Sequence, residues 1–267
     1  MGKRVYIAGL CLVVLILILS GWNIYAQLQI RKLEKTIDAY DTSVILHYQF
    51  EIFSKASGQD QNKHNLTLSI PFRNYLYYRG KPRPAGFSEY RSMVTNPYVS
   101  IDSYNYFSRY SQMATDPYDD AVIDSIVRQI NEAAIANNLT DHDDKAALTI
   151  RFVQSLNYIE DLVTKSYDEY PRYPVETLFE QGGDCEDTSI LAAAILTEMD
   201  YDVVLLLFEE LDHMAVAIHL TDGKGKGPSW ILDGKSYYYM DTSESLRIGV
   251  VPEEYEKTSA YVFPVGR

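Results

Sequence analysis

The chain has 267 residues, 46% of them hydrophobic, so it can bury the core of one ordinary domain and still carry an anchor and an extension. Its formal net charge is −13. Nucleic-acid binding depends on clustered Lys and Arg side chains, so this acidic balance argues against a nucleic-acid partner. The two cysteines, Cys11 and Cys185, are too few for a disulfide framework or a thiolate metal site.

The first segment is an uncharged run of eighteen residues from Val5 to Trp22, preceded by Lys3 and Arg4. At about 1.5 Å per residue the run spans roughly 27 Å, which is enough to cross a hydrocarbon core. It predicts a single-pass membrane anchor over 5–22, with residues 1–4 as a short cytoplasmic tail and the bulk of the chain outside the cytoplasm. A signal peptide cleaved after Ala26 is the alternative.

Two segments separate the anchor from the most regular part of the chain. Residues 23–40 alternate apolar and charged side chains and predict a juxtamembrane helix, which is too short to support a coiled coil. Residues 41–117 predict an N-terminal extension that packs on the main domain, and the sequence assigns it no role. Glycosylation sequons at Asn65 and Asn138 agree with an extracytoplasmic location.

From residue 116 the chain shows clear hydrophobic periodicity. The predicted elements are helices over 116–133 and 141–156, a helix over 185–199 that is apolar nearly all round, strands over 203–208 and 213–220, and a hairpin over 229–241. This order, with helices first and a central helix followed by antiparallel strands, predicts an α+β domain over 118–267.

Cys185 begins the apolar helix, directly after a Gly-Gly turn. Unpaired backbone N–H groups and the helix dipole favour a thiolate at such a position. The three neighbouring acids oppose it, so a thiolate here needs a nearby imidazolium. Two of them, Asp184 and Asp187, are explained by an N-cap and a first-turn position.

Among the five histidines, His213 is the best candidate for the base. It begins an alternating strand and shares one face with Ala215, Ala217 and His219. The alanines leave room on that face for the helix that carries Cys185. His219 lies about 20 Å further along the strand, so it does not serve the same thiol.

An acid is needed to orient the imidazole, and Asp241 is the best candidate. Asp233 precedes Gly234 and is explained by the hairpin turn alone, whereas Asp241 follows a run of strand residues where no turn is predicted. A metal site built from His213 and the acids around Cys185 is disfavoured, because those acids lie on different sides of one helical turn. The sequence calls for no metal and no cofactor.

Three motifs carry a resemblance to a known family. They are GGDCEDTSILAAAIL over 182–196, DHMAVAIHL over 212–220 and YYYMDTS over 237–243. They resemble the transglutaminase-like superfamily, specifically its microbial, membrane-anchored branch, over about residues 118–265. The resemblance implies a papain-like α+β core in which a central helix bearing the cysteine packs against an antiparallel sheet. It also implies Cys185 as nucleophile, His213 as base and Asp241 as orienting acid.

The residues next to the predicted nucleophile and base differ from those of animal transglutaminases, with Asp184, Glu186 and Met214 in place of their usual neighbours. We therefore expect a thiol enzyme that acts on amide bonds of a protein or peptide through an acyl-enzyme, as a protease, an amidase or an acyltransferase. The Cys185 N–H and an upstream group, Tyr173, are the expected oxyanion donors. The alternative is a non-catalytic, extracytoplasmic module that binds a peptide or glycan in the same cleft.

Overall fold

The computed structural model describes residue 27 and residues 42–53, 60–82, 110–139, 141–160, 170–220 and 227–266. The predicted anchor over 5–22 lies outside these residues, and so does the predicted juxtamembrane helix apart from Gln27. Within the described ranges, no helix is both long enough and apolar enough to cross a membrane.

The chain divides into two compact units. The larger unit contains Val44–Ile70 and Asn74–Arg267, and the main sheet and the candidate site belong to it. The smaller unit includes Thr42, Ser43 and Pro71–Arg73, where the Phe72 amide donates a hydrogen bond to the Thr42 carbonyl at 2.9 Å.

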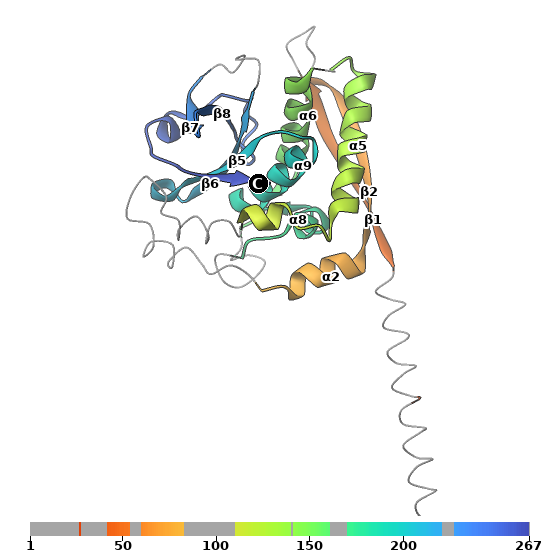
Figure 1. Ribbon diagram of the computed structural model, residues 1–267. Helices are drawn as coiled ribbons and strands as arrows, with labels where there is room; N and C mark the ends of the chain where they lie inside the picture. The colour runs from red at the N-terminus through yellow and green to blue at the C-terminus, as the bar shows by residue number, and fades with distance from the viewer. Residues whose placement is uncertain are drawn as a thin grey trace, which may run out of the picture. The chain divides into compact units, whose positions relative to one another are not determined.

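A buried helix, α9 (Cys185–Glu198), lies at the centre of the larger unit, and every residue from Cys185 to Leu196 is buried. One side of α9 packs on strands of the main sheet, and other sides contact three helices (Figure 1). These helices are α5 (Asp120–Ala136), α6 (His142–Gln154) and α8 (Pro174–Glu180). The predicted central helix is therefore confirmed, because a helix apolar on all sides must be covered on all sides.

The main sheet has five strands in the order β7-β8-β6-β5-β9, and all neighbours are antiparallel. The strands are β5 (Val203–Phe208), β6 (His213–His219), β7 (Ser229–Leu232), β8 (Lys235–Met240) and β9 (Tyr261–Val265). The hairpin between β7 and β8 turns at Asp233 and Gly234, which both have positive φ as the turn requires. The predicted α+β arrangement with an antiparallel sheet is confirmed.

The orientation of β6 differs from the prediction. Met214, Val216 and Ile218 belong to the core that contains α9, whereas Ala215 and Ala217 belong to a second core on the other face of the sheet. The prediction that the Cys185 helix approaches the alanine face was therefore wrong. The second core also contains the bulky rings of Tyr237, Tyr239 and Phe208, and the small alanines leave them room.

Two short elements flank the second core. They are η1 (Glu209–Leu211), between β5 and β6, and α10 (Glu253–Glu256), which precedes β9. Tyr255 of α10 packs against the second core. The start of β6, where His213 lies, is therefore covered by a segment far away in sequence.

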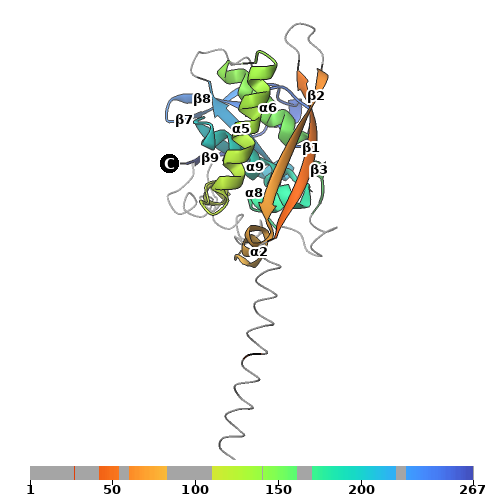
Figure 2. The same ribbon diagram turned by 90° about the vertical axis from the view of Figure 1, so that its right-hand side faces the viewer.

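The strands before residue 72 form a separate two-stranded sheet, β1 (Ser43–Phe53) with β2 (Asp60–Pro71), and α2 (Phe72–Gly80) follows. Figures 1 and 2 show this hairpin alongside α5 and α6. Tyr48 and Phe50 of β1 make edge-to-face contacts with Phe152 of α6, at centroid distances of 5.6 and 5.8 Å. These strands complete the core on the side of α6 away from the main sheet.

Candidate active site

The Gly-Gly turn fixes where α9 begins. Gly182–Gly183 is the short strand β4, which pairs in parallel with β3 (Asn157–Tyr158). A Cβ on Gly182 would lie 2.4 Å from the Asn157 carbonyl oxygen, and a Cβ on Gly183 would lie 2.5 Å from the Asp187 side chain. Both positions therefore require glycine because neighbouring groups approach the backbone closely.

Asp184 caps α9, as the sequence predicts. Its Oδ1 accepts a hydrogen bond from the Asp187 amide at 3.4 Å, and the Asp184 amide donates to Asp187 Oδ2 at 3.3 Å. This reciprocal pair satisfies backbone N–H groups that would otherwise be unpaired at the helix start. The two acids are thus used to build the turn that presents Cys185.

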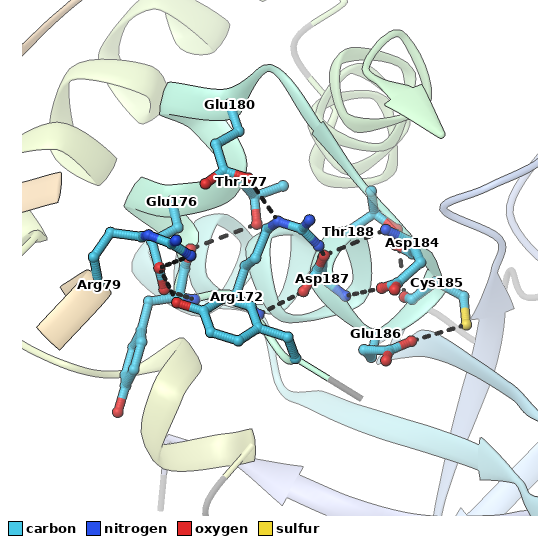
Figure 3. Close-up of polar contacts among 12 residues, drawn as sticks. Arg79, Arg172, Glu176, Thr177, Glu180, Asp184, Cys185, Glu186, Asp187 and Thr188 are labelled. Atoms are coloured by element: carbon cyan, nitrogen blue, oxygen red, sulfur yellow. Dashed lines mark hydrogen bonds and ion pairs between the residues drawn. The ribbon is translucent and has the colours of Figure 1, made fainter. Parts of the chain in front are cut away.

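Asp187 also forms a buried ion pair that the sequence analysis missed. Arg172, with no exposed side-chain surface, pairs with Asp187 Oδ2 through Nη1 and donates from its backbone N to Oδ1 at 2.5 Å (Figure 3). Its Nε also donates to Glu180 Oε2 at 3.0 Å. The one signal in the sequence was a single basic residue inside the Pro-rich loop before α8. The network ties that loop, α8 and the first turn of α9 together.

The thiol of Cys185 is buried beside a carboxylate, and these surroundings favour its protonated form. Its Sγ donates to Glu186 Oε2 at 3.3 Å (Figure 3). Burial raises the pKa of Cys185 well above its ordinary value, Glu186 and Asp184 raise it further, and a backbone hydrogen bond from Met214 opposes them. Burial, with the charge of Asp187, also raises the pKa of Glu186 to about 7.

His213 lies at the start of β6 with only 7% of its surface exposed. Its ring stacks on Tyr255, with centroids 4.5 Å apart and planes at 12°. Burial lowers the pKa of His213, and the charges of Asp241 and Glu254 oppose that shift. Above that pKa the imidazole is neutral and can accept a proton.

His213 and Asp241 are brought together, but not in direct contact. Their nearest atoms, Nε2 and Oδ2, are 3.8 Å apart, which is too long for a hydrogen bond. The hydroxyl of Tyr239 lies between them, 3.3 Å from His213 Nε2 and 2.6 Å from Asp241 Oδ2. The sequence analysis did not identify Tyr239, although it belongs to the YYYMDTS motif.

The second carboxylate oxygen of Asp241 organises a turn. Oδ1 accepts hydrogen bonds from the amides of Ser243 and Glu244 at 2.8 and 2.7 Å, and from the Ser243 hydroxyl at 2.9 Å. The expectation that Asp241 has no turn role was therefore wrong. One carboxylate fixes the turn and faces the histidine at the same time.

Thr242 links this turn to the helix that carries the cysteine. Its hydroxyl lies 2.9 Å from that of Thr188 and 3.1 Å from that of Ser189, both in α9. Ser189 also donates to the Met214 carbonyl, next to His213, at 3.2 Å. The chain segments of all three predicted site residues are thus joined by buried hydroxyl groups, although no hydrogen bond joins Cys185 to His213 among the described contacts.

Two further tyrosines lie within the electrostatic reach of the Cys185 sulfur. Partial burial raises the pKa of Tyr158, with Cys185 the next cause, although 57% of the residue surface is exposed beside the Gly-Gly turn, so the effect of burial is small. Burial also raises the pKa of Tyr255 to about 12, with a smaller contribution from Cys185. The ring of Tyr173, expected to contribute to the oxyanion site, instead packs on Tyr78 at 4.5 Å. Tyr158 is therefore the better upstream candidate.

In the part of the chain that the structure describes, the site coincides neither with a cluster of metal ligands nor with the cavity beside α6. Among the residues that the structure describes, no group of three or more His, Cys, Asp or Glu side chains is arranged to hold a metal ion. A cavity of about 320 Å³ lies beside α6, lined by residues such as Leu148, Arg151 and Ile248, and the three predicted site residues do not line it.

The fold and the site define an α+β protein with an antiparallel sheet and a cysteine at the start of a central buried helix. A family model described as a transglutaminase-like domain matches residues 119–255. The chain belongs to this family, which confirms the resemblance noted in the sequence.

Two comparisons with other proteins complete this picture. The chain is similar to two structures of Legionella pneumophila LapG. The EGTA-treated form is 17% identical, and the match covers 59% of this chain and 78% of the LapG chain with a TM-score of 0.34. The calcium-bound form is 19% identical, and the match covers 52% of this chain and 81% of the LapG chain with a TM-score of 0.28. No curated protein matches the chain.

Proposed function

We propose that this protein is a thiol enzyme that cleaves or exchanges amide bonds in a protein or peptide through an acyl-enzyme on Cys185. The observation that carries this proposal is the Thr242 hydroxyl, which joins the turn after β8 that contains Asp241 to the first turns of the Cys185 helix. A buried cysteine with a purely structural role has no need of a helix start, a neutral imidazole and a carboxylate in adjoining segments.

In the proposed reaction, His213 takes the thiol proton and the sulfur attacks the amide carbonyl carbon. An S–C bond forms and the carbonyl electrons move to oxygen, where the Cys185 N–H and the Tyr158 hydroxyl can donate hydrogen bonds. The oxyanion then collapses, the C–N bond breaks, and His213 protonates the departing amine. His213 then takes a proton from the attacking group, which is water for hydrolysis or a second amine for transfer, as that group bonds to the thioester carbon. The C–S bond breaks, and His213 returns the proton to the sulfur to restore the thiol.

The resting state sets one requirement on this reaction. Because the thiol contacts Glu186 and its pKa is raised, the proposed reaction has the sulfur lose its proton as the substrate binds rather than before. This differs from the expectation of a thiolate stabilised by an imidazolium. A substrate that displaces the Glu186 contact would free the proton for His213.

We expect Cys185→Ser to lose both products of this chemistry, because the hydroxyl is a far weaker nucleophile than the thiolate. The full chain is incubated with a mixture of tryptic peptides and a biotin-tagged primary amine, and mass spectrometry detects new peptide ends and amine incorporation. Cys11→Ser is the matched control and should behave as the wild type. Product formation that persists in Cys185→Ser would contradict the proposal. Equal peptide retention without products in all three proteins would indicate a binding module.

We also propose that the domain is held outside the cytoplasm by a membrane anchor over Val5–Trp22. The support is the length of that uncharged run, with Lys3 and Arg4 before it and the sequons only after it. The chain should sediment with membranes, and deletion of residues 1–26 should release it. Protease added to intact cells should digest the domain, whereas a resistant domain would place it inside. A mature N-terminus at Gln27 would show that the segment is a removed signal peptide.

A further inference from the structure

Among the described residues, the hydroxyl of Tyr239 provides the one hydrogen-bonded path between His213 and Asp241. Tyr239 has no exposed surface, and its strand β8 pairs with β6, which begins at His213. The direct distance of 3.8 Å between Nε2 and Oδ2 exceeds hydrogen-bond range, while the hydroxyl is within range of both atoms. Whatever orients the imidazole along this path must act through the tyrosine.

The direction of these hydrogen bonds follows from counting protons. Oδ1 of Asp241 accepts three hydrogen bonds, from the amide and the hydroxyl of Ser243 and from the amide of Glu244. Oδ2 accepts a hydrogen bond from the Tyr239 hydroxyl, so this carboxylate acts only as an acceptor in these contacts. A phenol has one proton to donate, and Tyr239 gives it to Asp241 at 2.6 Å. Its oxygen can therefore only accept from the ring of His213, and Nε2 must carry the proton.

Aromatic neighbours hold the imidazole in the plane that this bond needs. Tyr255 stacks on one face of His213 at 4.5 Å, and the ring of Phe208 lies 6.1 Å away at 30°. The same two residues also approach Tyr239, at 6.2 Å each. Burial in this cluster limits rotation of the imidazole and keeps Nε2 directed at the hydroxyl.

We propose that Tyr239 is a positioning residue for His213, which fixes the neutral imidazole as the Nε2–H tautomer and so leaves Nδ1 free to take the proton of Cys185. The transfer of the Cys185 proton to Nδ1 rests on the proposed function, whereas the tautomer is a property of the resting protein. A base needs a bare nitrogen, and fixing the proton on one nitrogen makes the other nitrogen available. Asp241 acts on the His213 tautomer through this hydroxyl, in addition to the direct effect of its charge on the pKa of the ring.

The tautomer can be read without any substrate. The full chain is labelled with ¹⁵N-histidine, and the ring nitrogen shifts of His213, assigned with His213→Gln, distinguish a protonated from a bare nitrogen. The wild type should show Nε2–H at a pH where the ring is neutral. Tyr239→Phe should reduce the preference for Nε2–H roughly tenfold, because it deletes the acceptor and keeps the ring.

Tyr237→Phe is the matched control. Tyr237 lies two residues earlier on β8, is equally buried in the same core, and also has its hydroxyl bonded to an aspartate, Asp202, at 3.0 Å. Loss of the Tyr237 hydroxyl should leave the His213 tautomer as in the wild type. Equal changes in the two variants would show a general loosening of the strand and overturn the proposal.

Asp241→Asn gives a sharper test, because the proposal expects the tautomer to invert. Ser243 and Glu244 still donate to the position of Oδ1, so the introduced amide nitrogen faces Tyr239 and donates to its oxygen. The hydroxyl proton must then point to His213 Nε2, which requires the proton on Nδ1. Adding Tyr239→Phe to this variant should abolish the inversion, since the signal passes through the hydroxyl.

These outcomes separate the two proposals. An Nδ1–H wild type, or an Asp241→Asn variant that retains Nε2–H, overturns the role of Tyr239 whatever Cys185 does. If the tautomers respond as expected while Cys185→Ser still forms products, the proposed function fails and the positioning of His213 by Tyr239 stands.

Discussion

Replacing Arg172 with Met is expected to lower the free energy of unfolding by about 3–5 kcal/mol, because it leaves the buried carboxylate of Asp187 without its partner. Neither side chain of this pair has exposed surface, so water cannot replace the lost guanidinium. The same guanidinium group also bonds Glu180, whose charge is then less compensated. Thermal or denaturant unfolding of the full chain measures the effect.

The exposed pair Lys257–Glu253 provides the control for this loss. Its side chains are 69% and 81% exposed, so Lys257→Met should change the unfolding free energy by less than about 0.5 kcal/mol. Adding Asp187→Asn to Arg172→Met should recover part of the stability, since the unpaired charge is then gone. An Arg172→Met variant as stable as Lys257→Met would mean that the network does not hold the start of α9.

The second large effect is expected at Glu186, whose replacement by Gln should stabilise the fold at high pH. The pKa of Glu186 rises from an ordinary 4.5 to about 7 in the folded protein, so between these values only the folded state keeps the proton. Stability therefore falls as pH rises through this window, by roughly 3 kcal/mol in total, and levels off above it. Glu186→Gln removes this slope, so its advantage over the wild type should be small at pH 4.5 and full at pH 8.

The same substitution should make Cys185 more reactive. The charge of Glu186 is one cause of the raised thiol pKa, so its removal should lower that pKa and increase the alkylation rate at pH 8 by about tenfold. Iodoacetamide labelling followed by mass spectrometry of the Cys185 peptide measures the rate. Glu132→Gln, an exposed site on α5, is the control and should match the wild type. A slower reaction in Glu186→Gln would show that the carboxylate instead helps to remove the thiol proton.

Local sequence patterns were sufficient for several elements of the main domain, although they did not predict α8, α10 or β9. The apolar run that became β5, the hairpin at Asp233–Gly234 and the all-round apolar helix α9 each lie within one or two residues of their predicted bounds. These patterns reflect secondary-structure preferences of the residues and the burial of their side chains, and both are visible in a short window of sequence. The stretch 66–78 was harder, because its β-favouring residues divide between the end of β2 and the helix α2.

The sequence by itself determined the chemical inventory of the candidate site: one cysteine at a helix start, one histidine at a strand start, and Asp184 as the cap between turn and helix. It could do so because caps, turns and strand ends have local signatures. Only the tertiary structure decided which face of β6 meets α9, that Tyr239 lies between His213 and Asp241, and that Arg172 pairs with Asp187. Those choices depend on how side-chain volumes and buried charges from distant segments fill one core, which no window of sequence contains.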